Sequence, residues 1–156
     1  MTTSRRLSRE IALKTLYQVN VGGLPPDEAL SGAFEANRPD PNDEAALAAW
    51  GHVQIYAAGL VRGVERNKIR FDNTISSLSH EWSPDRMPTA DRIILHIALQ
   101  ELEHPEDVPI AVVIDEAVEM AQMYSTDESG RFVNGVLGAF VRRRDPKPVS
   151  PPDAED

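Results

Sequence analysis

The sequence predicts an all-α protein, a compact bundle of about seven helices. Apolar residues recur at helical spacing through most of residues 4–142, and no alternating pattern typical of β-strands occurs. Loops rich in proline and glycine divide this pattern into segments of helix length. With 156 residues, 41% of them hydrophobic, the chain is long enough for one domain with a substantial core. We therefore expect one helical domain over residues 1–144.

The first half of the chain predicts four helices separated by breaks that contain glycine or proline. The first is capped by Ser4 or Ser8 and ends at Gly22-Gly23. The second begins at Pro25-Pro26, with acids in its first turn, and the third begins at about Asp43. The fourth is indicated by four large apolar residues at helical spacing: Phe71, Ile75, Leu78 and Trp82.

The second half predicts three more helices. Thr89 can cap the next helix, which is apolar almost all round up to Leu102, so we expect it to be buried at the centre. The stretch from Pro109 to Phe140 then predicts two helices joined by a short polar loop. In that loop, residues 125–128 (Ser-Thr-Asp-Glu) fit the spacing of a capping box.

Composition excludes several classes of protein. The chain has no cysteine, which excludes disulfides and thiolate metal sites. No apolar run approaches the ~18 residues of a membrane span, and no signal peptide is recognisable. We therefore expect a soluble, cytoplasmic protein without a membrane segment. Residues 145–156 are rich in proline and aspartate with almost nothing apolar, and we expect this tail to be disordered.

Charge permits binding to nucleic acid without requiring it. The formal net charge is −9, but residues 1–21 carry four cations against one acid and residues 51–80 carry four against two. The segments 22–50 and 81–108 are each strongly acidic. A polyanion could therefore meet a local basic patch, although the field of the whole molecule would not steer it there strongly.

Motifs of common enzymes are absent. The chain has no P-loop, no H-E-x-x-H and no G-x-S-x-G sequence. Its histidines (His52, His80, His96 and His104) lack metal-ligand spacing, and a structural role is the simplest interpretation. The acids Asp115, Glu116 and Glu119 are most simply a solvated helix face. We expect no catalytic activity, no cofactor and no metal site.

The N-terminal arginines admit two interpretations. Arg5 and Arg9 are one turn apart on the first helix, and Arg6 is adjacent. Cations at a helix N-terminus oppose the macrodipole, at a penalty of ~0.3–1 kcal/mol, which is a mild indication of function. The functional interpretation is phosphate contact, which suits the planar fork of arginine. On the residues alone, a solvated helix end is the simpler explanation.

Two aromatic residues, Tyr124 and Phe132, bracket the polar loop between the last two helices. Both rings could be core, and this explains Phe132 well. Alternatively they form a stacking platform for unpaired bases, whose edges the polar neighbours read. Asn134 could equally tie the last two helices together as a buried side chain, and Gly135 could allow close helix packing.

Three stretches carry a resemblance to a known family. The run EAVEMAQMYSTDESGRFVNGVLG, together with DRIILHIALQEL (residues 91–102) and SRRLSREIALKTLYQ (residues 4–18), closely resembles the NusB family of bacterial antitermination factors. The resemblance covers nearly all of residues 4–142 in the family's order. Asp91-Arg92 matches a further family motif, although a helix-start acid and a structural ion pair explain it more simply.

The resemblance implies a non-enzymatic RNA-binding factor. The family recognises a short single-stranded element (boxA) in ribosomal RNA leader transcripts and helps RNA polymerase to resist premature termination. It acts with a small-subunit ribosomal protein that is also transcription factor NusE. The RNA-binding positions implied for this chain are, in order, Arg5, Arg6, Arg9, Tyr17, Tyr124, Glu128, Ser129, Arg131, Phe132 and Asn134.

A basic partner protein is expected on an acidic face, because complementary charge speeds docking and fixes orientation. The candidate residues are Glu81 and Asp85 near a helix break, although a purely solubilising role is simpler for either one alone. A homodimer is possible. Two alternatives remain: a helical interaction module with an incidental basic patch, and a module related to the N-terminal domain of ribosomal RNA cytosine methyltransferases. The chain's length disfavours the second, because no residues remain for a cofactor-binding domain.

Overall fold

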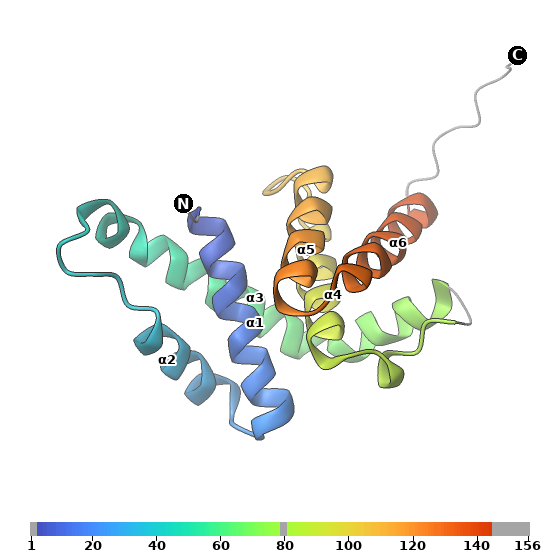
Figure 1. Cartoon of the computed structure of the whole chain (residues 1–156), viewed down its shortest axis with the longest axis horizontal. Helices are drawn as coiled ribbons and strands as arrows, with labels where there is room; N and C mark the ends of the chain where they lie inside the picture. Colours follow the sequence, from blue (N-terminus) through green and yellow to red (C-terminus); the bar gives the residue numbers. More distant parts are fainter. Residues whose placement is uncertain (1–2, 79–80, 145–156) are drawn as a thin grey trace, which may run out of the picture.

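A computed structural model describes residues 3–78 and 81–144 and confirms the all-α prediction. Within these ranges the chain forms six α-helices and one short 3-10 helix, η1 (Figure 1). The predicted disordered tail, 145–156, lies outside the described residues, as does His80. The helices are α1 (Ser4–Gly22), α2 (Pro26–Ala36), α3 (Glu44–Leu78), α4 (Thr89–Leu102), α5 (Ile110–Tyr124) and α6 (Asp127–Arg144), with η1 at Pro84–Arg86.

The expected third and fourth helices are one continuous helix, α3, of 35 residues. No proline or paired glycine interrupts the chain between Val64 and Phe71, and these two residues and Ile75 are all buried on the same helix face. The spacing of seven and then four residues fits one uninterrupted helix. Trp82 lies beyond the end of α3, where Pro84 begins η1.

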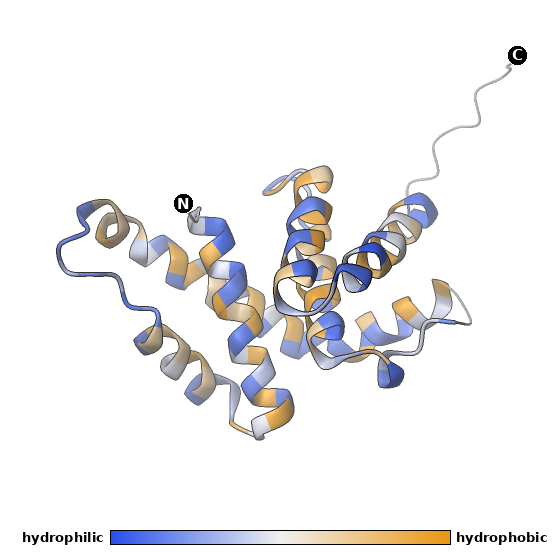
Figure 2. Ribbon diagram, viewed as in Figure 1, coloured by the Kyte–Doolittle hydropathy of each residue, from blue (hydrophilic) through white to orange (hydrophobic). Residues whose placement is uncertain are grey.

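The helix α4 lies at the centre of the fold, as its apolar sequence predicts. Every residue from Ile93 to Leu99 is buried, and α4 packs against α1, α3, α5 and α6. In Figure 1, α1, α2 and the first part of α3 lie to one side of α4, and α6 and the last part of α3 lie to the other. Helix α5 runs beside α4. Figure 2 shows hydrophobic residues along the facing sides of the helices and a hydrophilic connection between α2 and α3.

The ends of α1 are fixed by local chemistry. Thr3, rather than Ser4 or Ser8, caps the helix, because its Oγ1 accepts a hydrogen bond of 3.0 Å from the backbone N–H of Arg6. Ser8 is buried and donates to the carbonyls of Ser4 and Val53. At the other end Gly23 adopts φ 71°, the left-handed conformation in which glycine commonly terminates a helix.

The loop before α6 is two residues long. Thr126 Oγ1 accepts a hydrogen bond of 3.0 Å from the backbone N–H of Ser129, so Thr126 caps α6 in place of Ser125. The helices α5 and α6 then pack closely, since a Cβ atom on Gly130 would lie 2.7 Å from Gln122 Cγ. Among the described residues no helix is both long and apolar enough to cross a bilayer.

Candidate nucleic-acid interface

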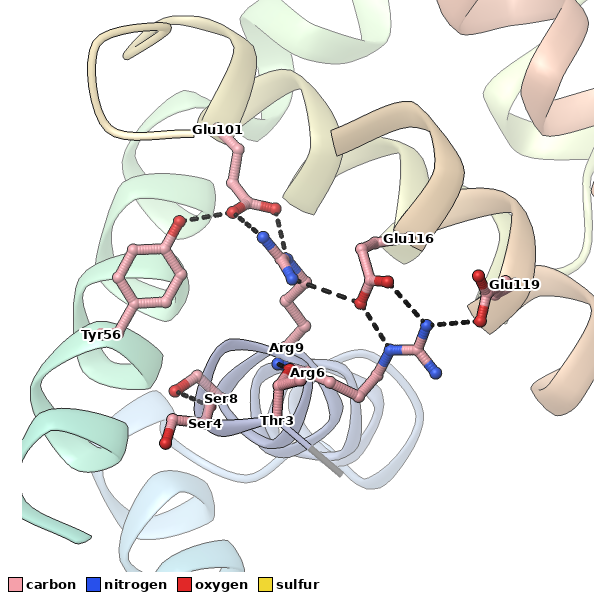
Figure 3. A network of polar contacts seen from close by, with 9 residues as sticks. All are labelled: Thr3, Ser4, Arg6, Ser8, Arg9, Tyr56, Glu101, Glu116 and Glu119. Carbon is pink, nitrogen blue, oxygen red and sulfur yellow. Dashed lines mark hydrogen bonds and ion pairs between the residues drawn. The ribbon is translucent and has the colours of Figure 1, made fainter. Parts of the chain in front are cut away.

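Arg9 is buried in an ion pair inside the fold. It is 3% exposed, and its Nε and Nη2 donate to the two carboxylate oxygens of Glu101 over 2.8 and 2.9 Å. The hydroxyl of Tyr56 donates to the same carboxylate (Figure 3). Burial and the hydrogen bond to Glu101 both raise the pKa of Tyr56, which therefore keeps its proton. Helices α1, α3 and α4 thus meet at one polar cluster.

Arg6 is also held by carboxylates of the protein itself. Its Nε and Nη2 donate to Glu116 over 2.6 and 2.9 Å, and Nη2 also donates to Glu119 over 2.8 Å (Figure 3). The hydrogen bond from Arg6 holds the pKa of Glu116 below its usual range, so this carboxylate stays ionised at neutral pH. Glu116 further accepts from Arg9 Nη1 at 3.4 Å. We name these six residues the arginine cluster: Arg6, Arg9, Tyr56, Glu101, Glu116 and Glu119.

The arginine cluster changes how the N-terminal cations are interpreted. Arg9 has almost no solvent-accessible surface, so in this structure it acts by anchoring α1 and not by facing a ligand. Arg6 is half-buried, and a phosphate would have to displace Glu116 or Glu119. Arg5 is different, because it is exposed and its guanidinium carbon lies 3.9 Å from the centre of the Tyr56 ring.

The far end of α1 lines an open groove of about 480 Å³. It is lined by Lys14 and Tyr17 of α1, by residues 88–90 at the start of α4, and by Tyr124 at the end of α5. Tyr17 is 43% exposed and Tyr124 is 36% exposed. We name this feature the tyrosine groove. Its two rings are 107 positions apart in the sequence, and the fold brings them together.

A second hollow of about 350 Å³ adjoins the first, with Pro88 lining both. Phe132 lines it and is half-buried, with its ring edge-on to Trp82 at 6.2 Å between centres. Met87 and Glu128 also line this hollow, which we name the phenylalanine pocket. Phe132 thus packs against Trp82 as a core residue would, and it also retains accessible surface, as a base-stacking residue would need. Trp82 was not identified from the sequence as a site residue, since it matches no site motif there.

Ser129 is buried beneath the phenylalanine pocket, where it organises the helix starts. Its hydroxyl donates over 2.8 Å to Oδ2 of Asp91, which is itself 2% exposed, and it lies 2.9 Å from the hydroxyl of Ser125. Among the described residues, Asp91 Oδ1 is a buried side-chain atom without a hydrogen-bond partner. Ser129 therefore stabilises the start of α6 beside the phenylalanine pocket by its hydrogen bond to Asp91. Asp91 is a buried residue at the start of α4, in agreement with the structural interpretation of this acid. Its neighbour Arg92 pairs with Asp72 of α3.

The remaining predicted residues of α6 lie on its outer surface. Glu128, Arg131 and Asn134 are all exposed. Asn134 is therefore not a buried tie between the last two helices. A Cβ atom on Gly135 would meet nothing within 4 Å, so close packing inside the protein does not explain this glycine either.

Of the two predicted partner residues, one lines the phenylalanine pocket and the other lies on the surface of η1. Glu81 lines the pocket, and Asp85 is exposed on η1. The acidic segment to which they belong is less acidic at its surface than its sequence suggests, because Asp91 and Glu101 are buried.

The histidines and acids offer little for a metal. In the part of the chain that the structure describes, only His104, Glu106 and Asp107 bring three candidate ligand atoms within 4.8 Å of one another, and all three are exposed. His96 is buried, with Nε2 2.7 Å from Asp72 Oδ1, as the structural interpretation of this residue predicts.

Fold and site together define an all-helical binding protein with an open aromatic surface. Comparison with known sequences identifies the family: the NusB family profile matches residues 6–142, and the chain belongs to the NusB family. Proteins of this family are transcription antitermination factors and not enzymes.

Curated relatives support this assignment over most of their length. The chain is 38% identical over 144 residues to the transcription antitermination protein NusB of Symbiobacterium thermophilum, covering 89% of this chain and 90% of the relative. It is 42% identical over 139 residues to that of Salinispora tropica, covering 88% of this chain and 95% of the relative.

Solved structures agree with the fold. T. maritima NusB superposes with a TM-score of 0.74 at 31% identity, covering 90% of this chain and 92% of the other. A chain from a complex of antitermination factors NusB and NusE with dsRNA superposes with a TM-score of 0.75 at 25% identity, covering 92% and 99%.

Proposed function

We propose that this protein is an antitermination factor that binds single-stranded RNA of the boxA type in ribosomal RNA leader transcripts. The observation that carries the proposal is the meeting of Tyr17, Tyr124 and Phe132 around two adjoining hollows. Tyr17 is far in the sequence from Tyr124 and Phe132, and each of the three residues retains accessible surface. Stacking on aromatic rings is the usual way in which proteins hold unpaired bases.

The polar surroundings suit base recognition. Glu128 lines the phenylalanine pocket, and Ser125 lines the tyrosine groove. Arg131 and Asn134 are exposed on α6, one and two positions from Phe132 respectively. Carboxylate, hydroxyl and amide groups can pair with base edges, and arginine binds phosphate. Lys14, which the sequence analysis did not single out, joins the set because its side chain lines the tyrosine groove.

The three N-terminal arginines take different parts in this proposal. Arg5 contacts RNA phosphate directly, since its guanidinium is exposed above Tyr56. Arg6 binds an RNA phosphate when that phosphate displaces Glu116 or Glu119 from its guanidinium. Arg9 fixes α1 in place through Glu101 and so sets the position of Tyr17 farther along the same helix.

A basic NusE-like ribosomal protein is the proposed partner, docking near Glu81 and Asp85. Support comes from the related complex, which contains NusE and dsRNA together with NusB, and from Glu81, which lines the phenylalanine pocket, with Asp85 exposed on the adjoining η1. A net charge of −9 limits how strongly this chain alone attracts RNA, so a cationic partner beside the pocket would raise the affinity. We place this assembly on the transcription elongation complex in the cytoplasm, with a homodimer as a possible resting form.

The test is RNA binding measured by fluorescence anisotropy across a salt series. Phe132→Leu should weaken binding by ~1–3 kcal/mol with little change in the salt slope, because stacking is not electrostatic. Arg5→Gln should reduce the slope by up to ~0.7 for its single-strand phosphate. Phe34→Leu is a matched control, since Phe34 is also half-buried and stacks edge-on against a tryptophan, Trp50. Equal losses of RNA affinity in both phenylalanine variants would identify Phe132 as a core residue and would refute its role in base stacking.

The partner is tested by repeating the titration with the purified NusE-like protein. We expect tighter RNA binding in its presence, and we expect Glu81→Lys with Asp85→Lys to abolish that gain. Enhancement that survives both changes would move the interface elsewhere, and no enhancement at all would leave the partner unsupported.

A further inference from the structure

The outward surface of α6 forms a stripe that begins beside the phenylalanine pocket. Five residues share this side of the helix by their spacing, and each is exposed or partly exposed: Arg131, Asn134, Gly135, Gly138 and Arg142. We name them the α6 stripe. Its eleven-residue span corresponds to about 17 Å of helix rise. It thus leads from the proposed base-binding site toward the C-terminal end of α6.

The charge along α6 is divided sharply. Both of its acids, Asp127 and Glu128, lie in the first turn, where they favour the helix N-terminus. Beyond them α6 has no carboxylate, and its last turn carries three arginines, residues 142–144. In a chain of net charge −9, this half of α6 is a basic surface.

Helix α3, which meets the end of α6, carries further exposed cations. Arg143 Nη1 donates over 2.7 Å to the hydroxyl of Ser77, so the end of α6 lies against the end of α3. Farther along α3, Arg62 and Arg66 are exposed. The acids in this half of α3 are half-buried and paired within the protein, Glu65 with Lys68 and Asp72 with Arg92, and Asp72 also contacts His96 Nε2 through a hydrogen bond.

The two glycines of the stripe leave the helix backbone open. Glycine inside a helix costs about 1 kcal/mol relative to alanine, so it usually has a packing reason. A Cβ atom on Gly135 would meet nothing within 4 Å, and one on Gly138 would meet only the guanidinium of Arg142, at 3.1 Å. No neighbouring helix therefore requires these glycines. Missing side chains allow another molecule to approach the backbone closely.

We propose that the α6 stripe and Arg143 bind the sugar–phosphate backbone of RNA that leaves the aromatic site, without regard to sequence. The proposal rests on the proposed RNA-binding function and extends it by a second contact region. Phosphates require cations without competing carboxylates, which this half of α6 offers and its first turn does not. The glycines admit the backbone, and the guanidinium of Arg142 lies over Gly138, within the stripe.

The experiment compares a short RNA that fills the aromatic site with the same RNA extended by about 8 nucleotides at either end, within the site sizes usual for single-strand binding. The double variant Arg142→Gln/Arg143→Gln should bind the short RNA normally. Its salt slope for one of the extended RNAs should fall by ~1.4, at ~0.7 for each lost contact. Arg38→Gln is the matched control for each single change, Arg142→Gln or Arg143→Gln, because Arg38 is exposed just beyond the end of α2 and its loss changes the net charge by the same one unit.

Gly135→Ala separates contact from stability. It should raise the protein's stability, since alanine favours the helix, and yet weaken binding of the extended RNA. Gly32→Ala in α2 is its control, because a Cβ there also meets nothing within 4 Å. A glycine with a purely structural role would not combine higher stability with weaker binding.

Three results would overturn the proposal. The first is equal affinity of the wild-type protein for short and extended RNA. The second is an unchanged slope in the double variant. The third is tighter binding of extended RNA by the double variant than by the wild-type protein. Failure of the base-binding site is distinguishable, because the short RNA would then not bind while the double variant still altered binding of the extended one.

Discussion

Replacing Glu101 by alanine should destabilise the protein severely, because it leaves the Arg9 guanidinium buried without its partner. The side chains of Arg9 and Glu101 are 4% and 2% exposed, and two hydrogen bonds of 2.8 and 2.9 Å join them. Removing one member of such a pair costs ~3–5 kcal/mol. For a domain of this size that corresponds to a fall in Tm of roughly 6–20 °C.

The assay is urea unfolding followed by circular dichroism. The exposed pair Arg38–Glu35, whose side chains are 66% and 70% exposed, provides the control, and Glu35→Ala should cost at most ~1 kcal/mol. The double change Arg9→Met/Glu101→Leu should recover most of the loss, because well-packed apolar residues can replace a buried pair without destabilisation. If Glu101→Ala costs no more than Glu35→Ala, the pair does not anchor α1 as argued.

The same double variant separates anchoring from RNA contact. If Arg9 only positions α1, the folded Arg9→Met/Glu101→Leu protein should bind RNA with nearly normal affinity and an unchanged salt slope. A slope reduced by ~0.7 would show instead that Arg9 reaches a phosphate in the complex, by leaving the arginine cluster.

Two further predictions concern buried polar groups. Ser129→Ala should destabilise the protein by ~1–3 kcal/mol in urea unfolding, because Asp91 loses the hydroxyl that donates to it; a cost near zero would mean that water replaces the hydroxyl. Burial lowers the pKa of His96 below its ordinary value of 6.5, although Asp72 opposes this, so the fold favours the neutral ring. Stability should therefore be complete above pH 6.5 and fall as the pH drops below it, and a His96→Gln variant that keeps the same slope would refute this cause.

The sequence predicts well what depends on local pattern. The central position of α4 follows from a helix that is apolar on nearly all sides, and seven consecutive buried residues confirm it. The end of α1 follows from Gly22-Gly23. The predicted division of α3 into two helices was wrong. Few apolar residues follow Val64 before Phe71, and from sequence alone such a polar stretch resembles the end of a helix.

The arginine cluster could not be predicted in the same way. Arg9 and Glu101 are 92 positions apart, and no spacing rule connects residues at that distance. A signal did exist, since cations at the start of α1 are locally unfavourable and therefore indicate a purpose. That signal does not distinguish an external phosphate from an internal carboxylate. Only the packing of α1 against α4 and α5 shows that Glu101 and Glu116 meet two of the three arginines.

The long chain separation within the arginine cluster has a consequence for how the protein is made. During synthesis α1 emerges first, and at roughly 5–20 residues per second the ribosome needs about 5–20 s to add the residues between Arg9 and Glu101. Until then the nascent helix presents Arg5, Arg6 and Arg9 together without the carboxylates that later hold two of them. In the nascent chain α1 is thus more cationic than in the finished protein, beside a ribosome made largely of RNA. Once α4 and α5 have been made and packed, Glu101 and Glu116 pair with Arg9 and Arg6, and the positive charge exposed on α1 decreases.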